Sequence, residues 1–299
     1  RAYYDAYVKR RLIRATELEQ VARDALRQAP HTGSLVAIER AEEAMESSRE
    51  AVVALDYRQR CTELADALFE NIGYQLTVER HHAIAKDRGA FMDTIDTPLN
   101  NYDWITIQCG LIRELNEEEA RLEAIRTMLN RTNPGPGGCY ANIGAYGQNG
   151  HLDPGQGWER DPGFLESPRM APGFYLLNLD EGRRRELGGV PLSAVRHVNV
   201  MNSTPIKVTY HDLNPRLNYK IRITFIGDIG SKREYWVRIT ANESHILEKE
   251  LWIESGIVSI KECSLPAEAI QDGRLELTIQ RVRGFKRLNV AEIWIMPVE

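Results

Sequence analysis

The hydrophobic repeat of this chain changes from a helical period to a strand period, and that change constrains the fold more than any other feature. In residues 1–132, apolar side chains recur at alternating steps of three and four, the stripe of amphipathic helices. In residues 187–299, apolar and polar side chains alternate at every second position, which is typical of half-buried strands. The sequence therefore predicts an α+β protein of two domains, an N-terminal α-helical bundle followed by a C-terminal antiparallel β-sandwich that is jelly-roll-like.

The first part, residues 1–132, carries several separate stretches of the helical stripe. Pro30 and Gly33 end the first stretch, and Asn116 is expected to be the N-cap of the last one, because three glutamates follow it. The second and third stretches form two helices or one long bent helix. The stretches are 3–28, 34–55, 56–72, 101–115 and 120–131.

Residues 133–173 contain ten glycines and six prolines, a density at which no regular element is expected. The segment also contains four aromatic side chains, which favour an ordered loop over a floppy tether. We therefore expect residues 133–186 to be an ordered Gly/Pro-rich loop or linker between the bundle and the sandwich.

The last part, residues 187–299, is expected to hold seven or eight short strands. Two runs have the clearest alternation, and their apolar members are predicted to face the core. These core residues are Ile206, Val208 and Tyr210 in the first run, and Tyr219, Ile221, Ile223 and Phe225 in the second.

Composition excludes several classes of protein. The chain has 38 basic and 43 acidic residues and a net charge of -5, so a nucleic-acid partner is not expected. No window approaches the length of apolar sequence that crosses a bilayer, so no membrane partner is expected either. The four cysteines include no Cys-x-x-Cys pair, which argues against a zinc site or a disulfide scaffold. Because the chain starts at Arg1, we expect it to be a piece of a longer protein.

Three of the five tryptophans are predicted to lie on polar faces of the sandwich. If Tyr235, Val237 and Ile239 face the core, alternation places neighbouring tryptophans beside arginine and glutamate. Flat aromatic rings next to such polar groups suit a sugar, whose C–H groups stack on indole while the polar groups bind its hydroxyls. The alternative is that the bundle or the Gly/Pro-rich loop covers this face. The candidate ligand-binding residues are Trp236, Trp252, Trp294, Arg238, Glu292 and Trp158.

A second candidate site lies in the polar segment 79–104, which has no clean helical or strand period. His81, Asp93 and Asp96 of this segment, together with Glu159, are candidate acid/base groups. The alternative is an ordered loop whose arginines and aspartates hydrogen-bond to one another. No cofactor is expected. Calcium is possible at the acidic residues Asp153, Glu159, Asp161 and Glu166, although no calcium-loop spacing supports it.

Three segments together resemble the C-terminal region of large, mostly uncharacterised bacterial carbohydrate-active proteins that are glycoside hydrolase-like. They are Gly89–Asn101, the Asn-Arg-Thr-Asn-Pro-Gly-Pro-Gly-Gly run within Leu129–Tyr140, and Asn289–Met296. The resemblance covers most of the chain. It implies a catalytic domain upstream in the same chain, with the bundle and a sandwich similar to carbohydrate-binding modules as an accessory unit.

We therefore expect a non-catalytic fragment of a polysaccharide-degrading enzyme, whose sandwich binds glycan or plays a structural role. Its expected partners are a polysaccharide or oligosaccharide and the upstream domain, and such a protein would act outside the cell or in the periplasm. One alternative is a glycosidase active site built from carboxylates at the domain interface. Another is a purely structural or protein-interaction module.

Overall fold

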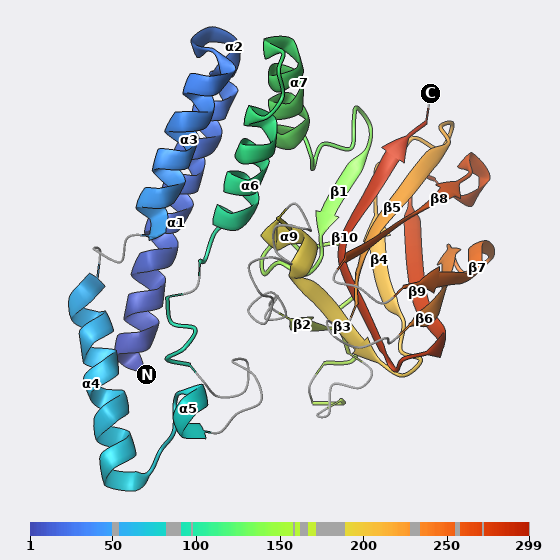
Figure 1. Ribbon diagram of the computed structural model, residues 1–299. Helices are drawn as coiled ribbons and strands as arrows, with labels where there is room; N and C mark the ends of the chain where they lie inside the picture. The colour runs from blue at the N-terminus through green and yellow to red at the C-terminus, as the bar shows by residue number, and fades with distance from the viewer. Residues whose placement is uncertain are drawn as a thin grey trace. The chain divides into compact units, whose positions relative to one another are not determined.

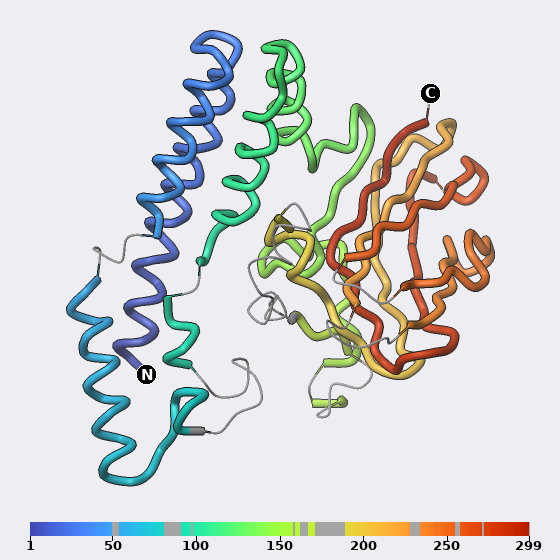
Figure 2. The backbone as a smooth tube through the Cα atoms, in the orientation of Figure 1, coloured from blue at the N-terminus to red at the C-terminus, as the bar shows by residue number. Residues whose placement is uncertain are grey.

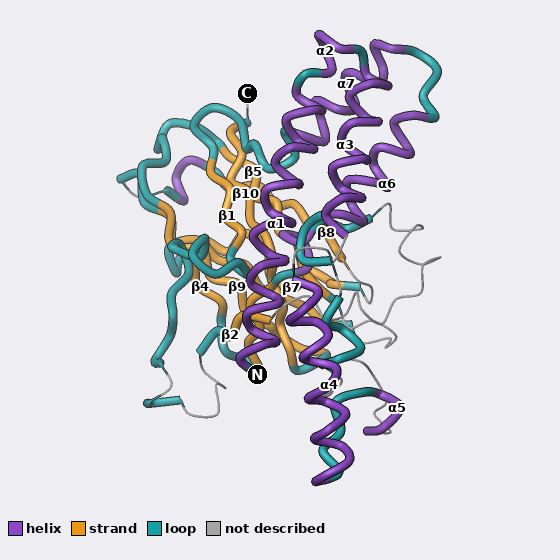
Figure 3. Tube along the Cα trace, turned by 90° about the vertical axis from the view of Figure 1, so that its left-hand side faces the viewer, coloured by secondary structure: helices purple, strands orange, loops and turns teal. Residues whose placement is uncertain are grey.

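The computed structural model describes residues 1–49, 54–81, 91–96, 98–157, 159–161, 167–171, 189–227, 234–254, 258–270 and 272–298. The chain divides into two compact units: unit 1 consists of Arg1–Arg131 and Leu176–Pro191, and unit 2 of Thr132–Tyr175 and Leu192–Glu299. The long helices belong to unit 1 and the strands to unit 2 (Figures 1 and 3). The predicted α+β class, with a helical part followed by a β-sandwich, is confirmed.

Unit 1 is built around a pair of long helices, α1 and α3, which lie side by side and run in opposite directions (Figure 2). The short helix α2 joins them, and Gly33 ends it with a positive φ of 88°. No described helix is long and apolar enough to cross a membrane. The helices of this unit are α1 (Ala2–Arg27), α2 (Ala29–Thr32), α3 (Ser34–Arg49), α4 (Leu55–Ile72), α5 (Val78–His81), α6 (Tyr102–Arg113) and α7 (Glu118–Leu129).

The core of unit 1 lies between α1, α3, α6 and α7. Small side chains such as Ala22, Ala37 and Ala41 are fully buried between α1 and α3, so the two backbones approach closely. Larger residues from α6 and α7 fill the rest of this core: Trp104, Ile105, Ile112, Ile125 and Met128. A second, smaller cluster around Tyr7 joins the first half of α1 to α4 and to Ile95.

The predicted N-cap at Asn116 is wrong. Helix α7 begins at Glu118, and its N-cap is Glu117, which makes no side-chain capping hydrogen bond. The Glu118 carboxylate instead caps the start of α3. It accepts hydrogen bonds from the backbone N–H of Ser34 at 2.8 Å and from the Ser34 hydroxyl at 2.5 Å. These bonds, followed by one from Arg121, lower the pKa of Glu118 from its ordinary 4.5 to about 2.

We expect the Glu118→Gln variant to melt at a lower temperature than the wild type at neutral pH. A carboxyl with a lower pKa in the folded state stabilises the fold above its unfolded pKa, and this contribution disappears as the pH falls. The difference between the two proteins should therefore shrink as the pH falls from 4.5 toward about 2. Thermal melting followed by circular dichroism measures it, with Glu119→Gln, one residue further along α7, as the matched control. A difference that stays constant over this range would contradict the capping role.

Unit 2 consists of two antiparallel sheets packed as a sandwich. In the larger sheet the strand order is β2-β3-β10-β5-β8, with β1 also paired to β10, and in the smaller it is β4-β9-β6-β7. A short helix, α9 (Leu192–Val195), precedes β3. The strands are β1 (Cys139–Asn142), β2 (Arg169–Ala171), β3 (His197–Met201), β4 (Ile206–Tyr210), β5 (Tyr219–Ile226), β6 (Tyr235–Ala241), β7 (His245–Ile253), β8 (Val258–Leu265), β9 (Leu275–Gly284) and β10 (Arg287–Pro297).

The inner faces of the two sheets form one large hydrophobic core. Every second residue of β4 and β5 points into it, as the alternation predicts, and each predicted core residue of these strands is at most 1% exposed. In β6, Tyr235, Val237 and Ile239 are also buried, so Trp236 and Arg238 lie on the opposite, outer face. The predicted registers of these strands are confirmed.

The expectation that residues 133–173 hold no regular element is wrong. Strands β1 and β2 lie in this segment, and β1 pairs with β10 along Cys139–Asn142. Leu152 also forms a bridge to Val208 of β4. The glycine and proline content of this segment does not favour strands by itself. Strands β10 and β3 nevertheless supply hydrogen-bonding partners for the backbones of β1 and β2. The described part of residues 133–173, which we call the glycine-rich segment, is therefore paired with both sheets of the sandwich.

Candidate functional site

Two tryptophans face each other across the hairpin of β6 and β7. Trp236 and Trp252 are direct register partners on the outer face of the four-stranded sheet. On the other side of β6, the register partner of Trp236 is Arg283 of β9. Side chains that are directly opposite on one face lie close enough to act together. Trp252 is 43% exposed, so this part of the face presents an indole to solvent.

The two indoles differ in what covers them. The Arg283 guanidinium lies over the Trp236 ring, with its Cζ atom 3.7 Å from the ring centroid, and it is ion-paired with Glu250 at 3.2 Å. An arginine on an aromatic ring is a favourable cation–π pair and occupies that face of Trp236. Lys261 is more distant from Trp252, its Nζ atom lying 5.6 Å from the ring centroid. Trp252 is therefore the more accessible of the two rings.

Polar groups extend this face along the sheet. Arg238 is exposed and lies two residues from Trp236 on β6, opposite Gln280 of β9. Further along the same strands, Thr240 and Thr278 are register partners. The face thus combines one open indole with guanidinium, amide, hydroxyl and carboxylate groups. We call the set Trp236, Arg238, Glu250, Trp252 and Arg283 the tryptophan face.

Trp294 and Glu292, which were also candidates for ligand binding, lie elsewhere and are buried. Both are on β10 in the six-stranded sheet, and their exposures are 2% and 0%. Tyr140 of β1, the register partner of Trp294, contacts both: its ring centroid is 5.0 Å from that of Trp294, and its hydroxyl donates to Glu292 at 2.7 Å. The predicted exposure of these two residues on a polar face is not observed, because both side chains are buried. Trp158 lies outside the described residues.

Two of the acid/base candidates in unit 1, Asp93 and Asp96, have structural partners. The Asp93 carboxylate accepts a 2.7 Å hydrogen bond from the backbone N–H of Val78, the first residue of α5. Asp96 accepts a hydrogen bond from the Tyr7 hydroxyl at 2.5 Å and forms an ion pair with Arg58 at 2.9 Å. Burial, followed by the hydrogen bond to Asp96, raises the pKa of Tyr7 to about 12.

The other two acid/base candidates are His81 and Glu159, and no contact of either with Asp93 or Asp96 is described. His81 is the last residue of α5, and its side chain lies outside the described residues. Glu159 is exposed and belongs to unit 2. A catalytic role for the four residues stays a prediction.

The possible calcium ligands of the glycine-rich segment make local turns where they are described. Asp153 accepts a hydrogen bond from the backbone N–H of Gly155, and Asp161 accepts one from Ser167. Glu166 lies outside the described residues. Among the residues that the structure describes, no three His, Cys, Asp or Glu side chains form a group that could hold a metal ion.

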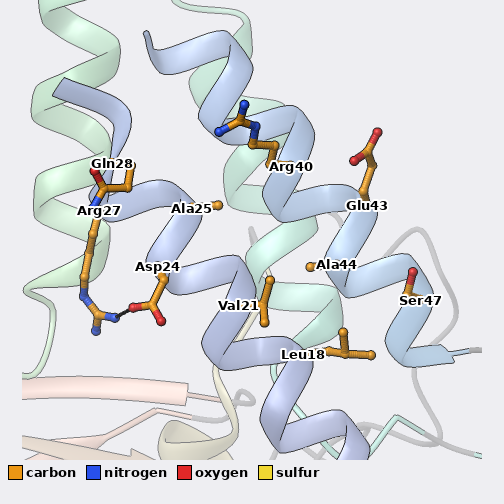
Figure 4. Close-up of a pocket in the computed structure, with 10 residues that line it drawn as sticks. All are labelled: Leu18, Val21, Asp24, Ala25, Arg27, Gln28, Arg40, Glu43, Ala44 and Ser47. Carbon is orange, nitrogen blue, oxygen red and sulfur yellow. Dashed lines mark hydrogen bonds and ion pairs between the residues drawn. The ribbon is translucent and has the colours of Figure 1, made fainter. Parts of the chain in front are cut away.

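Unit 1 has a groove of about 620 Å³ between α1 and α3 (Figure 4). Its floor is apolar, and its rim carries the ion pair between Asp24 and Arg27 as well as Arg40 and Glu43. Among the described residues that line the groove there is no histidine or cysteine. The apolar residues are Leu18, Val21, Ala25 and Ala44.

Sequence reasoning missed Arg283 as a site residue. Alternation places a residue on one face of its own strand, but it does not show which strand is the neighbour. The pairing of β6 with β9 brings Arg283 to Trp236, and β9 follows two intervening strands in the chain. A register shift between Trp236 and Val237 also sets this contact. Residues 281–287 contain three arginines, which is a signal in the sequence, but this does not show which residue Arg283 contacts.

The chain matches no protein-family model, and no curated protein matches it. Solved structures are similar to about a third of it. A family 35 carbohydrate-binding module from Clostridium thermocellum is 14% identical, with a TM-score of 0.27 and coverage of 34% of this chain and 78% of that one. A family 35 module from an environmental isolate is 13% identical, with a TM-score of 0.29 and coverage of 34% and 72%. The xylan-binding family 22 domain from Paenibacillus barcinonensis is 11% identical, with a TM-score of 0.28 and coverage of 35% and 74%.

Proposed function

We propose that unit 2 binds glycan through the tryptophan face, as an accessory module of a polysaccharide-degrading enzyme. The observation that carries this proposal is the exposed Trp252, which lies directly opposite Trp236 and its stacked arginine. A sugar ring has apolar C–H faces and polar hydroxyl edges, so it needs both kinds of group in one place.

In the proposed complex, one sugar ring stacks on the open indole of Trp252. Arg238 is exposed on the neighbouring strand, and its guanidinium donates to the hydroxyls at one edge of the ring. Glu250 supplies carboxylate oxygens that accept from hydroxyls, and its ion pair with Arg283 at 3.2 Å holds it in place. The tryptophan face contains one carboxylate, Glu250, whereas glycoside hydrolysis ordinarily uses two, so the proposed role is binding without turnover.

The alternative of a purely structural module draws support from Arg283, which fills one face of Trp236, and from the burial of Trp294. Under that alternative, the tryptophan face would cover another protein surface or stay free. The two functions predict different behaviour toward soluble polysaccharides.

Affinity electrophoresis of the whole chain through gels with neutral and acidic polysaccharides tests the proposal. We expect at least one polysaccharide to retard the protein relative to a gel without glycan, and a reference protein of similar charge to migrate unchanged. Equal mobility in every gel would overturn glycan binding and favour the structural alternative. Retardation by acidic polysaccharides alone, abolished by moderate salt, would indicate charge attraction instead of stacking.

A further inference from the structure

Cys139 and His151 lie side by side in unit 2, although the backbone at each of them pairs with a different sheet. Cys139 is the first residue of β1, which pairs with β10 in the six-stranded sheet. His151 precedes the Leu152 bridge to β4 of the four-stranded sheet, and its carbonyl accepts from the N–H of Thr209. The Sγ atom of Cys139 is 3.8 Å from Nε2 of His151.

The hydrogen bond at the other ring nitrogen determines which tautomer the neutral His151 ring adopts. Its Nδ1 atom lies 2.9 Å from the carbonyl oxygen of Thr209, and a carbonyl oxygen can only accept. Nδ1 therefore carries the hydrogen, and the lone pair of Nε2 points toward the Cys139 sulfur. The ring is also stacked on Tyr210, with centroids 4.6 Å apart and an interplanar angle of 28°. Histidines that bind metals characteristically donate their second ring N–H to a carbonyl or carboxylate in this way.

We propose that Cys139 and His151 form a binding site for a soft univalent metal ion, Cu(I). Bonds of the lengths that zinc makes, about 2.3 Å to sulfur and about 2.0 Å to nitrogen, would span the 3.8 Å between the two atoms at an angle of about 125°. One ion thus fits between the atoms where they stand.

The donor set selects Cu(I) over the commoner zinc. A structural zinc ion takes four protein ligands, whereas the described residues contain no group of three or more His, Cys, Asp or Glu side chains around a common point. A thiolate is a soft ligand and favours Cu(I), which is stable with two ligands. Cys139 and His151 are both half-buried, so an ion can reach them from solvent.

Binding replaces the thiol hydrogen with the metal. In the metal-free protein the Cys139 thiol can donate its hydrogen to Nε2 of His151, 3.8 Å from the sulfur. When Cu(I) binds, the S–H bond breaks, an S–Cu bond forms, and one proton passes to solvent. No electron is transferred, and the nitrogen of His151 supplies the second bond from its lone pair.

Anaerobic titration of the whole chain with Cu(I), in competition with the chelator bathocuproine disulfonate, tests this site. We expect one Cu(I) per chain to bind more tightly to the wild type than to Cys139→Ser, and His151→Gln to bind at least about tenfold more weakly. The matched controls Cys263→Ala and His245→Gln should bind like the wild type. Equal affinities in the wild type and His151→Gln would overturn the site, and so would a stronger preference for Zn(II).

X-ray absorption of the Cu(I)-loaded wild type gives a test that needs no variant. One sulfur and one nitrogen neighbour at bonding distance are expected. Two sulfur neighbours would place the ion at a pair of thiols, which contradicts the proposal. Circular dichroism of each variant shows whether a lost affinity reflects the ligand or the fold.

Discussion

The Trp252→Ala variant is expected to lose the retardation in polysaccharide gels while it keeps its fold. The indole is 43% exposed, so its removal leaves no large cavity. We expect the free energy of unfolding to fall by no more than about 1 kcal/mol, the value of a cross-strand pair on a sheet surface. The stacking contact with the sugar, in contrast, would lose its whole apolar surface. Relative mobility in gels with and without the retarding polysaccharide measures the binding, and chemical denaturation measures the stability.

Ile246 offers a matched control for this variant. It lies on the same strand and is 51% exposed, but it is not a register partner of either tryptophan. Ile246→Ala should migrate like the wild type in every gel. Trp252→Phe should keep part of the retardation, since a phenyl ring still stacks on a sugar. If Trp252→Ala is retarded as strongly as the wild type, the tryptophan face is not the binding surface.

The opposite pattern is expected for Trp294, whose indole is 2% exposed. Trp294→Ala should lower the free energy of unfolding by about 3–5 kcal/mol, because it removes a large buried side chain and leaves a cavity next to Tyr140. Denaturant unfolding followed by circular dichroism measures the loss, and the exposed Trp252 gives the comparison. A cost as small as that of Trp252→Ala would mean that the surroundings of Trp294 do not depend on it for packing.

Alternation made the outline of the sandwich predictable. A one-residue shift in a strand such as β4 would turn Ile206, Val208 and Tyr210 outward, so the sequence pattern determines which face is buried. The same argument places Trp236 on the outer face. It does not predict that Trp252 lies opposite, because two register shifts along β6 and β7 decide the pairing.

Other features depended on contacts between distant segments. Trp294 obeys the same alternation as Trp236, yet it is 2% exposed and lies beside Tyr140 of β1, a strand that the composition of the glycine-rich segment does not indicate. The pair of Cys139 and His151 has no spacing that marks a metal site. The two residues are brought together by backbone pairing with two different sheets. The cap on α3 likewise comes from Glu118, which is 84 residues away from Ser34 in the sequence.

The position of β10 sets the order in which the sandwich can fold. This strand pairs with β1, β3 and β5, and every other strand of the sandwich precedes it in the sequence. One of its contacts, between Tyr140 and Glu292, joins residues that are 152 positions apart. Such distant pairings are slow to form, because a long loop must close first. During synthesis, the four-stranded sheet can assemble as soon as β9 is available. Strands β3 and β5 cannot be joined until β10, which lies between them, has been made. The apolar inner surface of the growing sandwich then stays accessible to chaperones, or to other copies of the chain, until β10 takes its place.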